Sequence, residues 1–158
     1  MRILGGRMTK KKTVKKKKKK LPKISTLKNR ITKRCNAYIK QRDTINGKFT
    51  CISCQVEKEL DQFNAGHYVP VRGREFLRFN EWNINGECIA CNRGDEFHLI
   101  RYRRNLIEKI GLDAVLYLER NEQNKKKFNR QELNEIEEYY KKLSDFKTKK
   151  IKIPTEKG

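Results

Sequence analysis

Apolar residues follow a helical pattern in the first part of the chain, from about Thr26 to Asp43. Leu27, Ile31 and Ile39 lie four and eight positions apart, which places them on one face of a helix. The opposite face is basic, with Lys28, Arg30, Lys33, Arg34 and Lys40. The pattern therefore predicts an amphipathic helix whose basic side can lie along phosphates.

Helical periodicity returns in the last third of the chain. From Asn92 onward, one helix is predicted to end at Gly111, because apolar residues recur every three or four positions, at Leu99, Tyr102, Leu106 and Ile110. A short helix is expected over 112–119. Another opens at Asn129-x-x-Glu132, which resembles a capping box, and has one apolar face made of Leu133, Ile136, Tyr140 and Leu143.

The middle of the chain shows short extended segments instead. Asn46-Gly47 is a turn signal, and a short strand is predicted directly after it at 49–51. Further strands are predicted at 67–69 and 77–79. These elements together indicate an α+β fold in which a small irregular core is flanked by helices.

Composition limits the size of that core. Of the 158 residues, 35% are hydrophobic and 37% are charged, whereas ordinary globular domains have about 45–50% and about 25%. The length suits one small domain with tails.

No stretch approaches the ~20 apolar residues of a membrane span, and the first residues lack the apolar run of a signal peptide. We therefore expect a soluble, intracellular protein with no membrane partner.

The net charge of +21 is concentrated at the N-terminus. Residues 1–42 contain 18 basic residues and no acidic one. Because clustered lysines repel one another and cannot be buried, residues 1–22 are predicted to be disordered. Such an arm binds phosphate backbones without reading sequence, through lysines that include Lys15, Lys16, Lys17 and Lys18. A solubilising tail, or a nuclear-import signal in a eukaryotic host, is the alternative interpretation.

Two Cys-x-x-Cys pairs are the strongest local signal, Cys51 with Cys54 and Cys88 with Cys91. Each pair can bind one tetrahedral zinc through two thiolates, and four thiolates leave no open coordination position. We therefore predict a structural Zn²⁺. The lack of a secretory signal and a lone fifth thiol, Cys35, argue against disulfides.

The 33 residues between the pairs exceed the spacing of about 15–20 found in a plain zinc ribbon. They contain His67 and Asn83, and Asn92 follows the last cysteine directly. A neutral imidazole can accept a proton from water near neutral pH, and an amide oxygen can bind a hard cation such as Mg²⁺. Phosphodiester hydrolysis needs both an activated water and a charge sink for the leaving oxygen.

This arrangement resembles the HNH, or ββα-metal, nuclease family. More closely, it is similar to the lambdoid-phage NinG (Rap) recombination-endonuclease family, over about 35–145, in the stretches Ala65-Gly66-His67-Tyr68, Leu77-Arg78-Phe79-Asn80-Glu81 and Cys88-x-x-Cys91-Asn92. The resemblance implies a phage or bacterial DNA-recombination enzyme in the cytoplasm, associated with the nucleoid. Its activity would be metal-dependent, structure-selective cleavage of branched DNA such as Holliday junctions and D-loops.

The resemblance also implies roles for individual residues. His67 would be the general base, Asn83 would brace the loop and orient His67, and Asn92 would bind a catalytic Mg²⁺ or Mn²⁺. Branched or single-strand-containing DNA would be gripped beside the cut by a cluster of arginines, namely Arg72, Arg74, Arg78, Arg101, Arg103 and Arg104. For each arginine taken singly, a solvated charged face is an equal alternative.

One position departs from the HNH pattern, because many members have Asp before the general base where this chain has Gly66. The cation would then rest on Asn92, aided by Asp95 or Glu96. On one continuous helix at about 100° per residue those two return near the Asn92 face, whereas His98 falls about 240° away. We therefore expect Asn92 rather than His98 to be the third motif residue. A helix-capping role for Asn92 is the alternative.

The expected organisation is a disordered arm (1–22), a lead-in basic helix (23–48), a zinc-stapled HNH-like core (49–111), C-terminal helices (112–146) and a basic tail (147–158).

Three alternatives remain open at this level. The chain could be a non-catalytic zinc-binding module for DNA, RNA or the ribosome, or a structural protein that binds another recombination factor through its C-terminal helices. A homodimer could form through the face of Leu133, Ile136 and Tyr140, although the same stripe could pack on its own domain.

Overall fold

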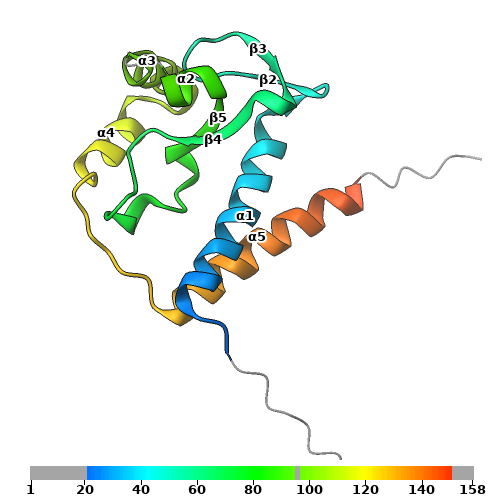
Figure 1. The fold of residues 1–158 in the computed structure, drawn as a ribbon, viewed down its shortest axis with the longest axis vertical. Coiled ribbons are helices and arrows are strands. Elements are labelled where there is room, and N and C mark those ends of the chain that lie inside the picture. The colour runs from blue at the N-terminus through cyan, green and yellow to red at the C-terminus, as the bar shows by residue number, and fades with distance from the viewer. Residues whose placement is uncertain (1–20, 95–96, 151–158) are drawn as a thin grey trace, which may run out of the picture.

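The computed structural model describes residues 21–94 and 97–150. Within them, five α-helices and two small antiparallel sheets form an α+β fold (Figure 1). The predictions for Lys15, Lys16, Lys17 and Lys18, for Asp95 and Glu96, and for the last eight residues lie outside the described residues. Within the described part, no helix combines the length and apolarity needed to cross a membrane.

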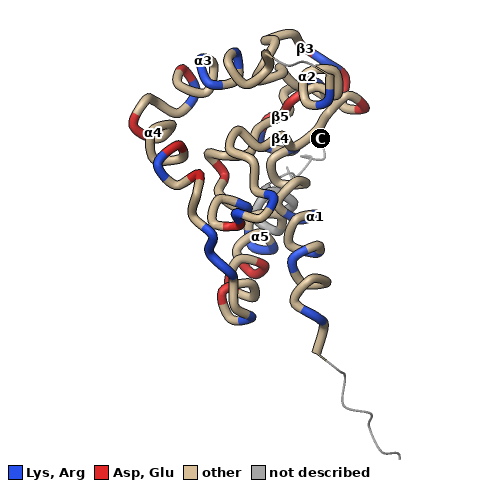
Figure 2. The backbone as a smooth tube through the Cα atoms, turned by 60° about the vertical axis from the view of Figure 1, so that its left-hand side comes forward, with Lys and Arg blue, Asp and Glu red and all other residues tan. Residues whose placement is uncertain are grey.

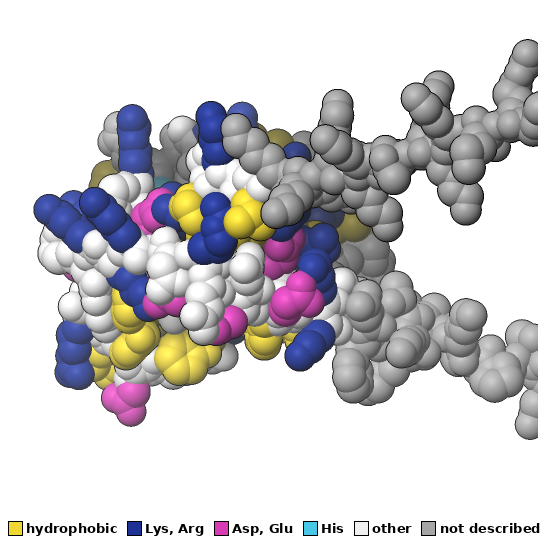
Figure 3. Space-filling model, turned by 90° about the horizontal axis from the view of Figure 1, so that it is seen from below, with side chains coloured by type: hydrophobic (Ala, Val, Ile, Leu, Met, Phe, Trp, Pro, Cys, Tyr) yellow, Lys and Arg dark blue, Asp and Glu magenta, His cyan; other side chains and the backbone are white. Residues whose placement is uncertain are grey.

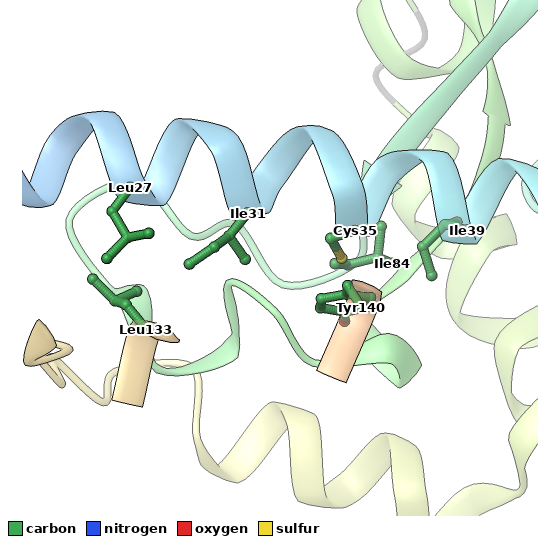
Figure 4. Packing of buried hydrophobic residues seen from close by; sticks show 7 residues of the cluster. All are labelled: Leu27, Ile31, Cys35, Ile39, Ile84, Leu133 and Tyr140. Carbon is green, nitrogen blue, oxygen red and sulfur yellow. The ribbon is translucent and has the colours of Figure 1, made fainter. Parts of the chain in front are cut away.

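Two helices from opposite ends of the chain pack along each other, α1 (Ile24–Asp43) and α5 (Arg130–Lys150). The buried face of α1 contacts Leu133 and Tyr140 of α5, and Ile84 closes the cluster (Figure 4). The amphipathic pattern of both helices is thereby confirmed, although α5 continues to Lys150, past the expected start of the tail. Because Leu133 and Tyr140 are 0% and 2% exposed, the stripe considered for dimerisation is already covered within one chain.

Polar contacts fix the ends and the register of this pair. The capping box of α5 is present, since Asn129 Oδ1 accepts from Glu132 N at 3.0 Å and Glu132 Oε2 accepts from Asn129 N at 2.9 Å. Glu137 of α5 is buried, and its carboxylate accepts hydrogen bonds from Arg30 and Arg34 of α1. Burial opposes ionisation of Glu137, but the hydrogen bonds from Arg30 and Arg34 and the nearby positive charges together outweigh it, so the pKa of Glu137 lies below the usual range.

The first sheet follows α1 and consists of β1 (Thr44–Ile45), β2 (Lys48–Thr50) and β3 (Glu57–Glu59). Asn46 and Gly47 join β1 to β2 with φ values of 50° and 81°. Both are left-handed, as a two-residue hairpin turn of the primed type requires. The predicted turn and the strand after it are confirmed, whereas β3 was not predicted.

The second sheet is a hairpin of β4 (Phe63–His67) and β5 (Ile84–Cys88), in which His67 pairs with Ile84. The strands predicted at 67–69 and 77–79 are wrong, because β4 ends at His67 and 75–77 form a 3₁₀ turn. The true partner, β5, was missed because every residue in it is buried. Its sequence includes Asn, Gly and Glu, which are uncommon in strands.

Three helices complete the fold: α2 (Ile89–Gly94), α3 (His98–Ile110) and α4 (Leu112–Arg120). The single helix predicted from Asn92 is wrong, because α2 ends at Gly94 and α3 starts at His98. The end of α3 at Gly111, with a φ of 86°, and the short helix α4 are confirmed. The buried faces of α3 and α4 pack on the loop between β4 and β5 in a second core made of Val69, Leu77, Tyr102, Leu106, Val115 and Leu118, with Ile52 beside them.

Candidate functional site

The four cysteines meet in one cluster, as predicted. Cys51 and Cys54 lie between β2 and β3, Cys88 ends β5, and Cys91 lies in α2. Their Sγ atoms all lie within 4.8 Å of one another, and four thiolates around one zinc with bonds of about 2.3 Å would be about 3.8 Å apart. The cluster is therefore compatible with a closed, structural zinc site.

The chain shapes the first half of this cluster without help from glycine. Gln55 adopts a left-handed φ of 57°, and its backbone N–H donates to the Cys51 carbonyl at 2.9 Å. Its side-chain amide donates to the Ile52 carbonyl at 3.0 Å. The backbone N–H of Cys88 donates to Cys51 Sγ at 3.3 Å, which ties the two halves together. The ligands are thus preorganised by local hydrogen bonds.

His67 lies at the end of β4 and is half-buried. Its Nε2 lies 3.2 Å from the Arg78 carbonyl, and a carbonyl only accepts, so Nε2 carries the ring proton and Nδ1 keeps the lone pair. Burial lowers the pKa of His67 below its usual 6.5, and the charge of Arg78 lowers it further against the opposing hydrogen bond. The ring is therefore neutral near neutral pH, with Nδ1 as its acceptor.

Asn83 holds the loop that follows His67. Its side chain is fully buried, with Oδ1 accepting from Val69 N at 2.7 Å and Nδ2 donating to the Val69 carbonyl at 3.0 Å. Nδ2 also lies 3.4 Å from the Leu77 carbonyl. One amide thus fastens both ends of the β4–β5 loop.

Asn92 and His98 occupy different surroundings. Asn92 is exposed inside α2, so it does not cap a helix that starts there. His98 is the first residue of α3, and its Nδ1 lies 2.8 Å from Glu87 Oε1. The angular preference for Asn92 over His98 assumed one continuous helix, and the break after Gly94 removes its basis.

A buried polar network under this site was not predicted. Asn85 Oδ1 accepts from Arg42 at 2.9 Å and from Lys109 at 2.8 Å, which joins α1, β5 and α3. Its Nδ2 donates to the Tyr102 hydroxyl at 3.1 Å, and that hydroxyl donates to the Gly66 carbonyl at 3.0 Å. The available signal was the alternation of polar residues Asn83, Asn85 and Glu87, which has the period of a strand.

The predicted arginine cluster is partly engaged within the fold. Arg78 pairs with Glu75 at 3.3 Å, and Arg103 pairs with Glu119 at 2.6 Å. Arg72 and Arg104 are exposed, whereas Arg74 and Arg101 are intermediate. Lysine and arginine also mark α1 and the segment before α5 (Figure 2), and basic side chains surround smaller apolar patches on the face seen from below (Figure 3).

These features define a small α+β protein with a four-cysteine cluster, compatible with a zinc site, at the end of a two-stranded hairpin. The family model described as "Bacteriophage Lambda NinG protein" matches residues 6–151, and the chain belongs to the NinG family. It is 38% identical to protein ninG of Escherichia phage lambda over 113 residues, and 36% identical to protein ninG of Salmonella phage P22 over the same length.

Each of these alignments covers 71% of this chain and 53% of the relative. The chain thus spans about half the length of these relatives. No solved structure shows a significant match.

Proposed function

We propose that the chain is a metal-dependent, structure-selective DNA endonuclease of the HNH type that cleaves branched recombination intermediates such as Holliday junctions and D-loops. The observation that carries the proposal is the placement of His67 and Asn83 at the two ends of one loop. A neutral histidine with an acceptor nitrogen lies at the end of β4, and a buried amide fastens the loop after it. Membership of the NinG family, together with the resemblance of its motifs to HNH nucleases, supports this assignment.

In this mechanism, Nδ1 of His67 takes the proton of the attacking water. The Arg78 carbonyl keeps the ring in the tautomer that leaves Nδ1 unprotonated, and Asn83 keeps that carbonyl's loop in place. A bound Mg²⁺ or Mn²⁺ would supply the positive charge that stabilises the leaving oxygen. Asn92 offers an amide oxygen to such an ion from the exposed part of α2.

DNA would be held by basic side chains that face solvent. Arg72 follows the His67 strand, Arg104 lies on α3, and Lys33 lies on the exposed face of α1. The lysines of the arm would add affinity without sequence preference. Since these contacts reach phosphates, selectivity for branches would come from the shape and flexibility of the DNA.

The test is a cleavage assay on a four-way junction and on a linear duplex of the same sequence, with Mg²⁺, with Mn²⁺ and with EDTA. His67→Gln retains a donor for the Arg78 carbonyl but is a poor base, so the cleavage rate should fall by about 10²–10⁴. Junction binding in Ca²⁺ should stay within about twofold, because the imidazole is not a phosphate anchor. Gln123→Ala, an exposed residue after α4, is the control.

Normal cleavage by His67→Gln would refute the assignment. Binding without cleavage by the wild-type chain, under all metal conditions, would instead favour a non-catalytic nucleic-acid module. The pH profile adds a second readout: burial lowers the pKa of His67, so the rate should fall only as the pH drops below 6.5. A cleavage rate that already falls at pH 6.5 or above, as the pH is lowered, would contradict His67 as the base.

A further inference from the structure

The carboxylate of Glu87 is buried without enough partners to balance its charge. Glu87 lies in β5 and is 0% exposed. Its Oε1 accepts from the Ser53 hydroxyl and contacts His98 Nδ1 at 2.8 Å, while Oε2 has no hydrogen-bond partner among the described residues. A buried carboxylate costs several kcal/mol unless a cation or donors compensate it. Oε2 therefore lies where a positively charged ligand would be stabilised.

That unpartnered oxygen lies beside the residue that precedes His67. A Cβ at Gly66 would be 2.5 Å from Glu87 Oε2 and 3.1 Å from Glu87 Cβ. Glu87 pairs with Asn64 in the hairpin register, so its side chain leans along the sheet face toward Gly66. Because Gly66 has no side chain, the Glu87 carboxylate can occupy the space above it. The carboxylate thus comes close to the His67 end of β4, although it originates on the opposite strand.

His98 supplies a second donor at the same place. Its side chain is 21% exposed, so the pair is reachable from the surface. Two neighbouring ligands of an octahedral cation with bonds of about 2.1 Å lie about 3.0 Å apart, close to the 2.8 Å between Glu87 Oε1 and His98 Nδ1. The two groups can therefore hydrogen-bond to each other without a cation, and bind one together when it is present.

Two parts of the four-cysteine cluster position Glu87. Ser53 lies inside the first Cys-x-x-Cys loop, and Glu87 directly precedes Cys88. The hydroxyl of Ser53 donates to Glu87 Oε1, so the structural metal centre also positions the carboxylate. Carboxylate ligands suit Mg²⁺ and Mn²⁺, whereas imidazole suits transition metals, so a mixed set admits Mn²⁺ more readily than Mg²⁺.

We infer that Glu87 and His98 bind a divalent cation of the Mn²⁺ type, with Glu87 reaching across the hairpin beside Gly66. This inference rests on the proposed nuclease function for its purpose, because it places a cation beside Gly66, the residue that precedes His67 in β4. It does not rest on that function for its test, since cation binding can be measured without DNA.

The test measures Mn²⁺ binding by electron paramagnetic resonance or calorimetry, using the full, zinc-loaded chain. Glu87→Gln preserves the size of the side chain, and His98→Ala removes the nitrogen donor. Each should weaken Mn²⁺ binding by at least about tenfold, as loss of a metal-site residue commonly does. Glu137→Gln, a second buried glutamate that pairs with arginines on α1, is the matched control and should bind as the wild type does. Zinc content and thermal unfolding confirm that each variant is folded.

A second test moves the carboxylate from residue 87 on β5 to residue 66 on β4. Glu87→Ala removes the oxygen that blocks a side chain at residue 66, leaving one contact at 3.1 Å that needs a shift of a few tenths of an ångström. Adding Gly66→Asp then returns a carboxylate to the same place from β4. The double variant should regain Mn²⁺ affinity relative to Glu87→Ala alone, and a folded double variant without any gain would contradict the placement beside Gly66.

The outcomes separate the two proposals. Wild-type Mn²⁺ affinity in both Glu87→Gln and His98→Ala, or loss of binding only in Asn92→Ala, overturns the cation site whatever the chain does to DNA. Mn²⁺ binding that depends on Glu87 and His98, in a chain that cleaves no DNA, supports the cation site and refutes the nuclease.

Discussion

The α1–α5 pair and the β4–β5 hairpin are held together by different forces. Between α1 and α5, side chains such as Leu27, Ile31 and Leu133 are removed from water, each contributing about 1.5–3 kcal/mol. The hairpin is fixed instead by four thiolates and by buried polar groups such as Asn83 and Glu87. One region therefore depends on apolar surface, and the other on buried hydrogen bonds and a cysteine cluster that is compatible with zinc.

This difference separates stability from function. Apolar packing tolerates substitution by residues of similar size and shape. Replacing a buried amide or carboxylate is more destabilising, because its hydrogen-bond partners then stay buried without a partner. The candidate base His67, the bracing Asn83 and the buried Glu87 lie in or directly beside the second region. We therefore expect four changes to act differently on the two regions, and we give them from the largest effect to the smallest.

Removing a zinc ligand should have the largest effect. Cys88→Ser should lose zinc and with it the order of the hairpin and α2, because zinc binding of this kind contributes on the order of 10 kcal/mol to folding. Elemental analysis and circular dichroism would measure both. Cys35→Ala, a buried cysteine on α1 outside the cluster, should keep full zinc content. Unchanged zinc and unfolding temperature in Cys88→Ser would disprove the metal centre.

Truncating the apolar pair should come second. Leu133→Ala leaves a cavity against α1 and should lower the free energy of unfolding by about 2–5 kcal/mol, measured by urea titration. Zinc stoichiometry should stay the same, which would show that the two regions are held independently. Leu112→Ala, about half exposed at the start of α4, should change the free energy little. If Leu133→Ala also released zinc, the two regions would not be separable.

Asn83→Ala should be milder for stability and severe for activity. The Val69 N–H and carbonyl would lose their partner, at a cost of about 1–3 kcal/mol. Cleavage should fall much more than this cost implies, because the loop behind His67 is released. Nicking rates measured far below the unfolding temperature separate the two effects. Asn124→Ala, an exposed asparagine before α5, should change neither, and an equally active Asn83→Ala would rule out the bracing role.

Loss of the α5 cap should have the smallest effect. Asn129→Ala removes the acceptor for Glu132 N and should cost about 1 kcal/mol, with zinc content and cleavage unaffected. Asn134→Ala, an exposed residue inside α5, should be neutral or slightly stabilising because alanine is the better helix former. Thermal unfolding of the two variants side by side checks the difference, and equal unfolding temperatures would contradict it.

Sequence reasoning succeeded where periodicity or fixed spacing carries the information. The faces of α1 and α5, the Asn46-Gly47 turn, the Asn129–Glu132 cap and the four-cysteine cluster all belong to this group. Each depends on residues within a few positions of one another or, for the cysteines, on two Cys-x-x-Cys pairs whose spacing is typical of a zinc site.

It failed where the structure depends on contacts between distant segments. The strand β5 was missed because its polar residues are buried by partners far away in sequence, such as Arg42 and Lys109 around Asn85. The break between α2 and α3 was missed because the apolar periodicity, which begins at Leu99, was extended back to Asn92 across Gly94. The contact between Glu87 and the space over Gly66 follows from hairpin register, which the pattern of residues does not reveal.

The pairing of α1 with α5 also determines when the protein can be completed during synthesis. Arg30 and Glu137, which meet across this pair, are 107 positions apart. At about 5–20 residues per second, α1 leaves the ribosome roughly 5–20 s before its partner exists. In that interval its apolar face is uncovered, while all four cysteines have already been made. The newborn chain therefore presents the apolar face of α1 without its partner, and offers the complete set of four cysteines to a metal ion, before its last helix has been made.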